Sequence, residues 1–489
     1  MMRTHLARAF AALAALLVAG SARAEEPTPT SPPEHPSVLP AGAPLPEGKK
    51  RAPQDYDGRP DTTTTGEDAL WVPRVLFAPL YFVTDIVIRR PLGALVVAVE
   101  QADVISKVTD FFAFGPNHSV GIVPTAFYDF GFRPSVGIYY FYDDLFAPHN
   151  DLRATVATGG EKYLKARIVD RIPIHVTKDR DGVEAVPTYA QIEVDGLARA
   201  DYLHYGVGWS APHSNESTFE QRSVGGGARV HVEPVKGSFV ESWLLARGHL
   251  FSDGECAPER RGGRSHCEDL PLLTGVETGL FERPAGFDGY ATLKVGARGV
   301  IDTRRPRPLP GSGFGVDGRV ELATDVMTPG SWLQAGGSIG GWIDLTGARR
   351  VLGLTLDARV IEPFGDYRVP FTELIGAGRT DSVPEDDLIR GFAPGRLLGE
   401  SSVVATLEYS WPIWSFIDAT MQAQVGNVFA RNFEDFDFER LRFSFVGGFR
   451  SPNHRDHALN LLVGFGTSPF VMGGEPDTLR FLIGGTTGF

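Results

Sequence analysis

The chain lacks long apolar runs and is poor in cysteine. Beyond Ala24 no stretch approaches the roughly 18 uncharged apolar residues that a spanning helix needs, so the sequence excludes helical membrane spans. It holds two cysteines in 489 residues, too few ligands for a closed zinc site. A phosphate-binding loop is also missing, and a formal charge of −13 argues against nucleic acid as a partner. We expect no cofactor, no bound metal and no enzymatic activity.

The first residues predict export. Arg3 precedes an apolar stretch of Ala and Leu at 11–19, and Ala22 and Ala24 occupy the −3 and −1 sites that signal peptidase requires. Residues 1–24 are therefore expected to be a cleavable signal peptide. Since no cysteine follows the cleavage site, the pattern excludes a lipoprotein.

The two cysteines, Cys256 and Cys267, lie at the ends of a polar loop. In an oxidising compartment outside the cytoplasm, a disulfide that closes this small loop is the expected outcome. Metal binding by the same pair is the weaker alternative.

Two segments precede the main domain. Residues 25–66 are dense in proline and polar residues without an apolar period, which predicts a disordered periplasmic linker. Residues 67–118 are strongly apolar, and Leu92, Leu95 and Val99 recur at helical spacing. This segment is expected to be an amphipathic helix on the inner leaflet or at the mouth of the β-barrel that residues 119–489 are expected to form, or else a buried packing segment.

From residue 119 to the end the apolar period is two. In 418–425, for example, Ala419, Met421 and Ala423 alternate with polar residues. Successive side chains of a strand point to opposite faces, so each such stretch has one apolar and one polar face. A soluble sandwich gives the same pattern, but the polar faces here carry charges that a sandwich core does not accept. The chain also has 57 glycines and 32 phenylalanines, which suits short strands, turns and aromatic girdles.

We therefore predict an all-β membrane fold: an antiparallel transmembrane β-barrel over 119–489, with 16 strands out of 16–18 candidates. An even number returns both ends to the periplasm. The closing strand contains Gly484 and Gly485 and ends at Phe489. Its glycines are expected to weaken the pairing of this strand with the first strand of the barrel, or else to allow close packing.

The segment 389–414 is the most specific part of the sequence. It contains Arg390-Gly391-Phe392, and the strand after it carries Glu408 next to an aromatic residue. In this it resembles the BamA/TamA superfamily of outer-membrane proteins (bacterial surface antigen family). The resemblance also covers the turns 300–311 and 205–208 and the strand end 426–429.

The resemblance implies a loop, 362–401, that folds back into the barrel and is locked there. Arg390 is expected to meet Glu408 as a charge-assisted pair, and Arg396 to matter less. Family members often carry a second acidic residue where this chain has Gln424, so the lock would depend on one carboxylate; Asp418 is the nearest charged alternative.

The sequence departs from the family at its start. Members usually place periplasmic POTRA domains of about 75 residues before the barrel, whereas the expected linker and helix leave no room for one here. Without such a domain, the resemblance gives weaker grounds for expecting the family's complete assembly role in this chain.

Two further patterns are expected to be coincidental. Residues 336–340 match the GxSxG nucleophile elbow, but they lie in a period-two stretch instead of a strand–turn–helix. His454 and His457 have metal-like spacing in what reads as a short turn.

The resemblance implies a monomeric Gram-negative outer-membrane protein, embedded in outer-membrane lipids, that assists insertion or translocation of client proteins. A passive or gated pore, and a structural surface antigen, are the alternatives.

Overall fold

The computed structural model describes most of the predicted barrel. The described residues are 111–115, 118–129, 131–178, 184–212, 215–255, 271–279, 282–304, 311–345, 349–377, 388–414, 417–450 and 460–484. The predicted signal peptide, the linker 25–66, nearly all of 67–118, both cysteines, both histidines of 454–457, Gly485 and Phe489 lie outside the described residues.

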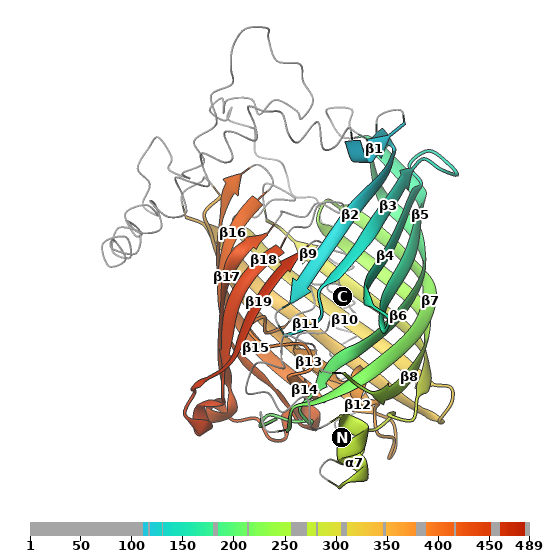
Figure 1. Ribbon diagram of the computed structural model, residues 1–489. Coiled ribbons are helices and arrows are strands. Elements are labelled where there is room, and N and C mark those ends of the chain that lie inside the picture. Colours follow the sequence, from blue (N-terminus) through green and yellow to red (C-terminus); the bar gives the residue numbers. More distant parts are fainter. Residues whose placement is uncertain are drawn as a thin grey trace. The chain divides into compact units, whose positions relative to one another are not determined.

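Sixteen antiparallel strands form one closed barrel (Figure 1), which confirms the predicted fold and strand number. In chain order the strands are β2 (Val120–Asp129), β3 (Ser135–Asp143), β4 (Asp151–Gly160), β5 (Tyr163–Lys178), β6 (Glu184–His204), β7 (Ser217–Val235), β8 (Ser238–Asp253), β9 (Tyr290–Asp302), β10 (Gly313–Asp325), β11 (Gly330–Asp344), β12 (Val351–Pro363), β15 (Ser401–Trp414), β16 (Ile417–Phe429), β17 (Arg442–Arg450), β18 (Asn460–Thr467) and β19 (Pro476–Gly484). A two-residue strand, β1 (Ala113–Phe114), pairs with the start of β2. The helix α7 (Leu272–Glu277) lies between β8 and β9.

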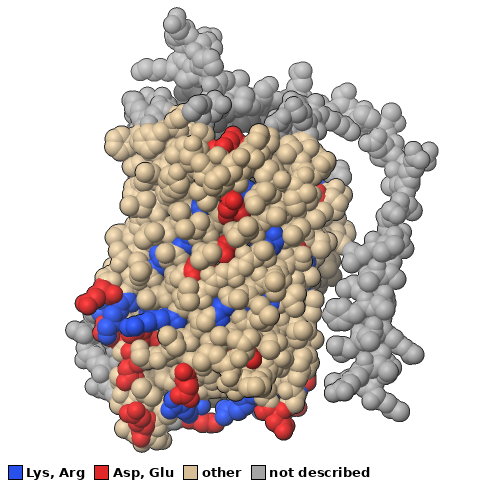
Figure 2. All heavy atoms as spheres, turned by 90° about the vertical axis from the view of Figure 1, so that its right-hand side faces the viewer, with Lys and Arg blue, Asp and Glu red and all other residues tan. Residues whose placement is uncertain are grey.

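The wall follows the alternation seen in the sequence. On β12, Leu354 and Leu356 point outward and are 60% and 49% exposed, whereas Asp357 and Arg359 form an ion pair in which both side chains are largely covered. Figure 2 shows one side of the wall, which is mostly uncharged, with charged side chains gathered toward its lower end. An apolar outer face and a charged inner face are the arrangement of a membrane-spanning barrel.

In the described part of the chain, no helix is long and apolar enough to cross a membrane.

The two ends of the barrel differ in their connections. The longest ones leave β6, β8, β12 and β16, and therefore all lie at the end opposite the start of β2, which is the lower end in Figure 1. In outer-membrane barrels the longer loops are extracellular and the short turns periplasmic. We assign this end as extracellular.

The barrel closes where β19 pairs with β2. Among the described residues, 127–129 of β2 lie opposite 482–484 of β19, and β19 before Leu482 extends past the end of β2. On its other side, β2 pairs with β3 from Val120 to Phe127. Pro124, in the middle of β2, lies opposite Ile138 of β3 and has no N–H to donate.

Candidate functional site: the loop inside the barrel

The connection between β12 and β15 enters the lumen from the extracellular end. Its described parts include a short 3-10 helix, η6 (Phe371–Glu373), and a small sheet of β13 (Ile375–Ala377) and β14 (Leu397–Gly399). Figure 1 draws β13 and β14 within the lower part of the barrel. An apolar cluster joins this segment to the wall: Ala323, Trp332, Ile361, Val369, Leu374, Ile375, Leu388, Ile389, Phe392, Leu397, Val404 and Val428. Apolar burial thus stabilises the infolded position.

The tripeptide Arg390-Gly391-Phe392 binds the barrel wall through its backbone. The Arg390 N–H donates to Gln424 Oε1 on β16 at 2.8 Å. The Gly391 N–H donates to Ser444 Oγ on β17 at 3.0 Å, and the Gly391 carbonyl accepts from Thr478 Oγ1 on β19 at 2.9 Å. Strands near the closing end of the chain therefore hold the tripeptide.

Gly391 lies too close to the wall for any larger residue. A Cβ there would be 2.3 Å from the Phe465 carbonyl oxygen and 2.3 Å from Ser444 Oγ. The next residue, Phe392, is fully buried, and its ring covers Gly466, where a Cβ would lie 2.4 Å from the ring. Glycine is thus required on the loop and on the wall so that the two surfaces can meet.

Gln424 contacts the loop both as acceptor and as donor. Its Oε1 accepts from Arg390, and its Nε2 donates to the Leu388 carbonyl at 2.8 Å and to Thr406 Oγ1 at 3.2 Å. An ionised carboxylate can only accept hydrogen bonds. Gln424 therefore adds a contact that an ionised acidic residue would not make.

Glu408 points into the lumen. Its carboxylate accepts from Arg450 Nη2 at 2.5 Å and from Gln422 Nε2 at 2.7 Å, and it also has a Coulombic interaction with Arg390. The expected partner of Glu408 was Arg390, and Arg450 was missed; it lies two strands away on β17, in register with Asp418 of β16. Asp418, the alternative acid, lies at the periplasmic start of β16 and is largely buried.

A second anchor holds the loop to the opposite wall. The Glu373 carboxylate accepts from Lys294 Nζ at 2.5 Å and from the Tyr290 hydroxyl at 3.0 Å, both on β9. Beside it, the Phe371 ring packs edge-on to Phe219 of β7, with ring centroids 5.1 Å apart. The loop therefore spans the lumen. No motif marked these residues in the sequence.

Tyr367 fastens the same loop near its start. Its hydroxyl donates to Asp325 Oδ2 at 2.9 Å, and its ring stacks on Trp332 with centroids 5.9 Å apart. Burial and then the Asp325 carboxylate raise the pKa of Tyr367 above its ordinary value, so the phenol stays protonated and able to donate.

Arg396 is a third anchor of the loop, and the expectation that it matters less than Arg390 remains a prediction. Its side chain is 1% exposed, its Nη2 lies 2.5 Å from Asp477 Oδ2 on β19, and its guanidinium stacks on Tyr205 at 4.6 Å from the ring centroid. Arg442 of β17 shares Asp477 at 3.2 Å. The sequence alone could not show that Asp477 and Tyr205, both far away along the chain, pack around this arginine.

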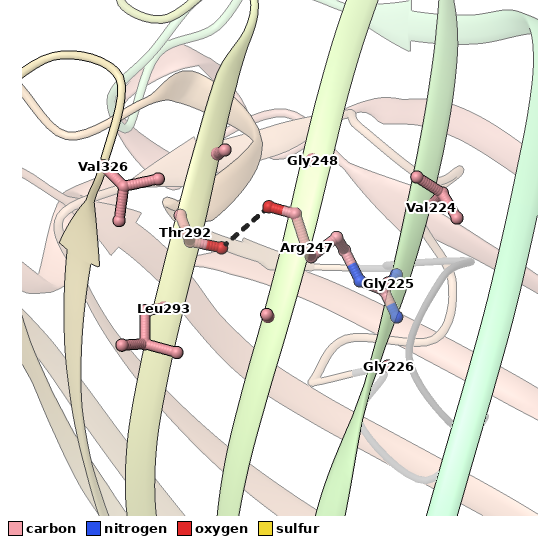
Figure 3. Close-up of a pocket in the computed structure, with 10 residues that line it drawn as sticks. Val224, Gly225, Gly226, Arg247, Gly248, Thr292, Leu293 and Val326 are labelled. Atoms are coloured by element: carbon pink, nitrogen blue, oxygen red, sulfur yellow. Dashed lines mark hydrogen bonds between the residues drawn. The ribbon is translucent and has the colours of Figure 1, made fainter.

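A shallow hollow of about 450 Å³ lies on the outer wall at β7, β8 and β9 (Figure 3). Its walls are apolar and include Val224, Leu293 and Val326, all well exposed on the outward face. At its floor a Cβ on Gly248 would meet nothing within 4 Å. Because no group of polar side chains converges there, the hollow has the character of a lipid-facing surface and not of a catalytic pocket.

The GxSxG match, residues 336–340, lies in the middle of β11 and pairs on both sides with β10 and β12. It therefore lacks the strand–turn–helix geometry of a nucleophile elbow. No group of three or more possible metal ligands occurs among the described residues.

No protein-family model matches this chain, and neither does any curated protein. Among solved structures, it is similar to BamA from Haemophilus ducreyi lacking POTRA domains 1–3, with 16% identity, a TM-score of 0.49, and coverage of 76% of this chain and 70% of that one. It is also similar to CdiB from Acinetobacter baumannii (13% identity, TM-score 0.42, 76% of this chain and 60% of that one) and to CdiB from Escherichia coli (9%, 0.43, 77% and 64%). The chain spans less than two thirds of each CdiB chain. At this level the similarities carry no argument about function.

Proposed function

We propose that this protein is an exported outer-membrane barrel of the BamA/TamA type that assists insertion or translocation of client proteins and acts without catalysing a reaction. The observation that carries the proposal is the seam between β19 and β2: β2 ends at Asp129, opposite Leu482, so the described residues 476–481 of β19 extend past the end of β2 and pair with none of its residues. A strand edge that lacks a partner over this stretch is easier to separate than one paired along its whole length. The infolded loop, bearing the tripeptide of the family, is fastened next to this seam.

A disulfide across the seam tests the proposal. Tyr128 and Ile483 lie directly opposite each other on β2 and β19, so Tyr128→Cys with Ile483→Cys can lock the seam. The matched control is Val136→Cys with Thr158→Cys, which are opposite each other within the wall on β3 and β4. Replacing Cys256 and Cys267 by Ser leaves only the engineered pair to react.

The locked seam is expected to lower the levels of other barrel proteins or surface lipoproteins in the native host, and a reductant should restore them. The control lock should leave these levels unchanged. Normal levels with the seam fully oxidised would remove the proposed role.

A gated pore is the second candidate, favoured by the charged lumen. Ion pairs such as Arg247 with Asp195 at 2.6 Å and Arg298 with Asp317 line the inner wall, while the loop occupies the extracellular half. Deletion of 372–399 followed by planar-bilayer recording separates the two functions. Two results together favour the pore. The conductance is steady, solute-selective and higher after the deletion, and the disulfide across the seam leaves the levels of other outer-membrane proteins unchanged.

A further inference from the structure

Arg480 is a contact of the tripeptide that no sequence motif marked. It lies on β19, is 7% exposed, and points into the lumen beside the loop. Its Nη1 donates to the carbonyl oxygen of Arg390 at 3.3 Å and to that of Phe392 at 3.2 Å. The guanidinium therefore holds the two ends of the tripeptide by their backbone, whatever the side chains are.

The same guanidinium crosses the seam. Its Nη2 lies 3.0 Å from Asp129 Oδ2, and its Nε lies 3.3 Å from both carboxylate oxygens. Asp129 is 2% exposed and belongs to β2, where it sits opposite Leu482 in the seam register. One side chain thus joins the docked loop, the last strand and the first strand of the barrel.

This arrangement makes the two sites energetically dependent on each other. If the seam opens, Arg480 loses a buried carboxylate partner; if the tripeptide leaves, it loses two buried acceptors. In either case a charge is left in the wall with fewer partners, which is costly in a low-dielectric site. Each contact is therefore worth more while the other is intact.

We propose that Arg480 is a positioning residue that couples docking of the tripeptide to closure of the β19–β2 seam. The loop then holds the seam shut, and its release loosens the seam. This coupling goes beyond the proposed function, because it is a property of the barrel itself and requires no client protein.

The coupling can be measured on the purified full-length protein in lipid nanodiscs. Spin labels on Tyr128→Cys and Ile483→Cys, in a background with Cys256 and Cys267 replaced by Ser, face each other across the seam. They should show strong dipolar broadening in the parent. Arg480→Gln is expected to abolish most of this broadening, and Arg480→Lys, which lacks the planar fork, to reduce it.

Two matched controls make the result specific. Arg247→Gln removes another lumen arginine, paired with Asp195 at 2.6 Å within the wall, and should leave the seam signal unchanged. A label pair at Val136→Cys and Thr158→Cys on β3 and β4 should keep its broadening in every variant.

If Arg480→Gln does not fold, Gly391→Ala provides the test from the loop side, since its Cβ would collide with the Phe465 carbonyl and displace the tripeptide. The proposal predicts loss of seam broadening in that variant also. Unchanged broadening in every folded variant at these two positions, or an equal loss in Arg247→Gln, would overturn it. If the disulfide across the seam leaves the levels of other outer-membrane proteins in cells unchanged, only the proposed role in inserting or translocating client proteins is contradicted.

Discussion

The Arg396 guanidinium on the infolded loop bonds the Asp477 carboxylate on β19, the strand that closes the barrel. Both side chains are largely buried, so Arg396→Ala leaves Asp477 with fewer partners. Breaking a buried pair on one side typically costs about 3–5 kcal/mol. We expect a clear fall in the temperature at which the folded band is lost on semi-native gels.

The control for this change is Arg431→Ala. Arg431 pairs with Glu362, and both side chains are more than a third exposed, so screening limits its contribution to about 0–1 kcal/mol. Equal behaviour of the two variants would mean that Arg396 is not an anchor.

Gly391→Ala should release the loop by collision. The added Cβ would lie 2.3 Å from the Phe465 carbonyl oxygen, which is backbone and cannot move aside easily. Overpacking of this kind costs about 1–3 kcal/mol. Protease cleavage within the loop, followed by mass spectrometry, should accelerate, whereas Gly341→Ala, whose Cβ would meet nothing within 4 Å, should behave as the parent.

Gln424→Glu should weaken docking in a pH-dependent manner. An ionised carboxylate still accepts from Arg390 but cannot donate to the Leu388 carbonyl, and it places a charge against that oxygen. The variant is therefore less stable than the parent at neutral pH. As the pH falls through the pKa of the new carboxyl group, protonation restores a donor and the difference narrows.

The parent carries an amide at this position and should show no such change. Thermal denaturation of both proteins between pH 4 and 8 provides the measurement. A difference that is constant across this range would show that donation to Leu388 contributes nothing.

Phe392→Ala should create a cavity beside Gly466. The ring is fully buried in the apolar cluster of the loop, and Phe→Ala changes in a core cost about 3–5 kcal/mol. Phe438→Ala, at a residue 74% exposed on an extracellular connection, should cost little. Denaturant titration of both variants in detergent tests the difference, and similar midpoints would contradict the packing described here.

The fold could be predicted from the sequence because the side chains along each strand of a barrel alternate between the lipid-facing and the lumen-facing side. Residues such as Val316 and Asp317 alternate in sequence, and the structure places them on β10 with the valine exposed and the aspartate in an ion pair with Arg298. Strand number followed from counting such stretches. The predicted export signal and the Cys256–Cys267 disulfide lie outside the described residues and remain predictions.

The site was accessible only in part. Arg390, Gly391 and Phe392 form a local motif, so a single sequence can show them. Their partners come from strands far along the chain: Arg480 and Asp129 are separated by 351 positions and meet only because the barrel closes. An inward-facing arginine in a strand near the end of the chain is the one available signal, and many lumen arginines share it.

Cysteine labelling in intact cells tests the central claim, that the loop lies inside the barrel and is held there. With Cys256 and Cys267 replaced by Ser, Leu397→Cys places a thiol at a position that is fully buried on β14, and Phe438→Cys places one on an exposed connection at the same end. The account predicts that a membrane-impermeant maleimide modifies Cys at 438 rapidly and Cys at 397 only after denaturation. Equal, rapid labelling of both would contradict it.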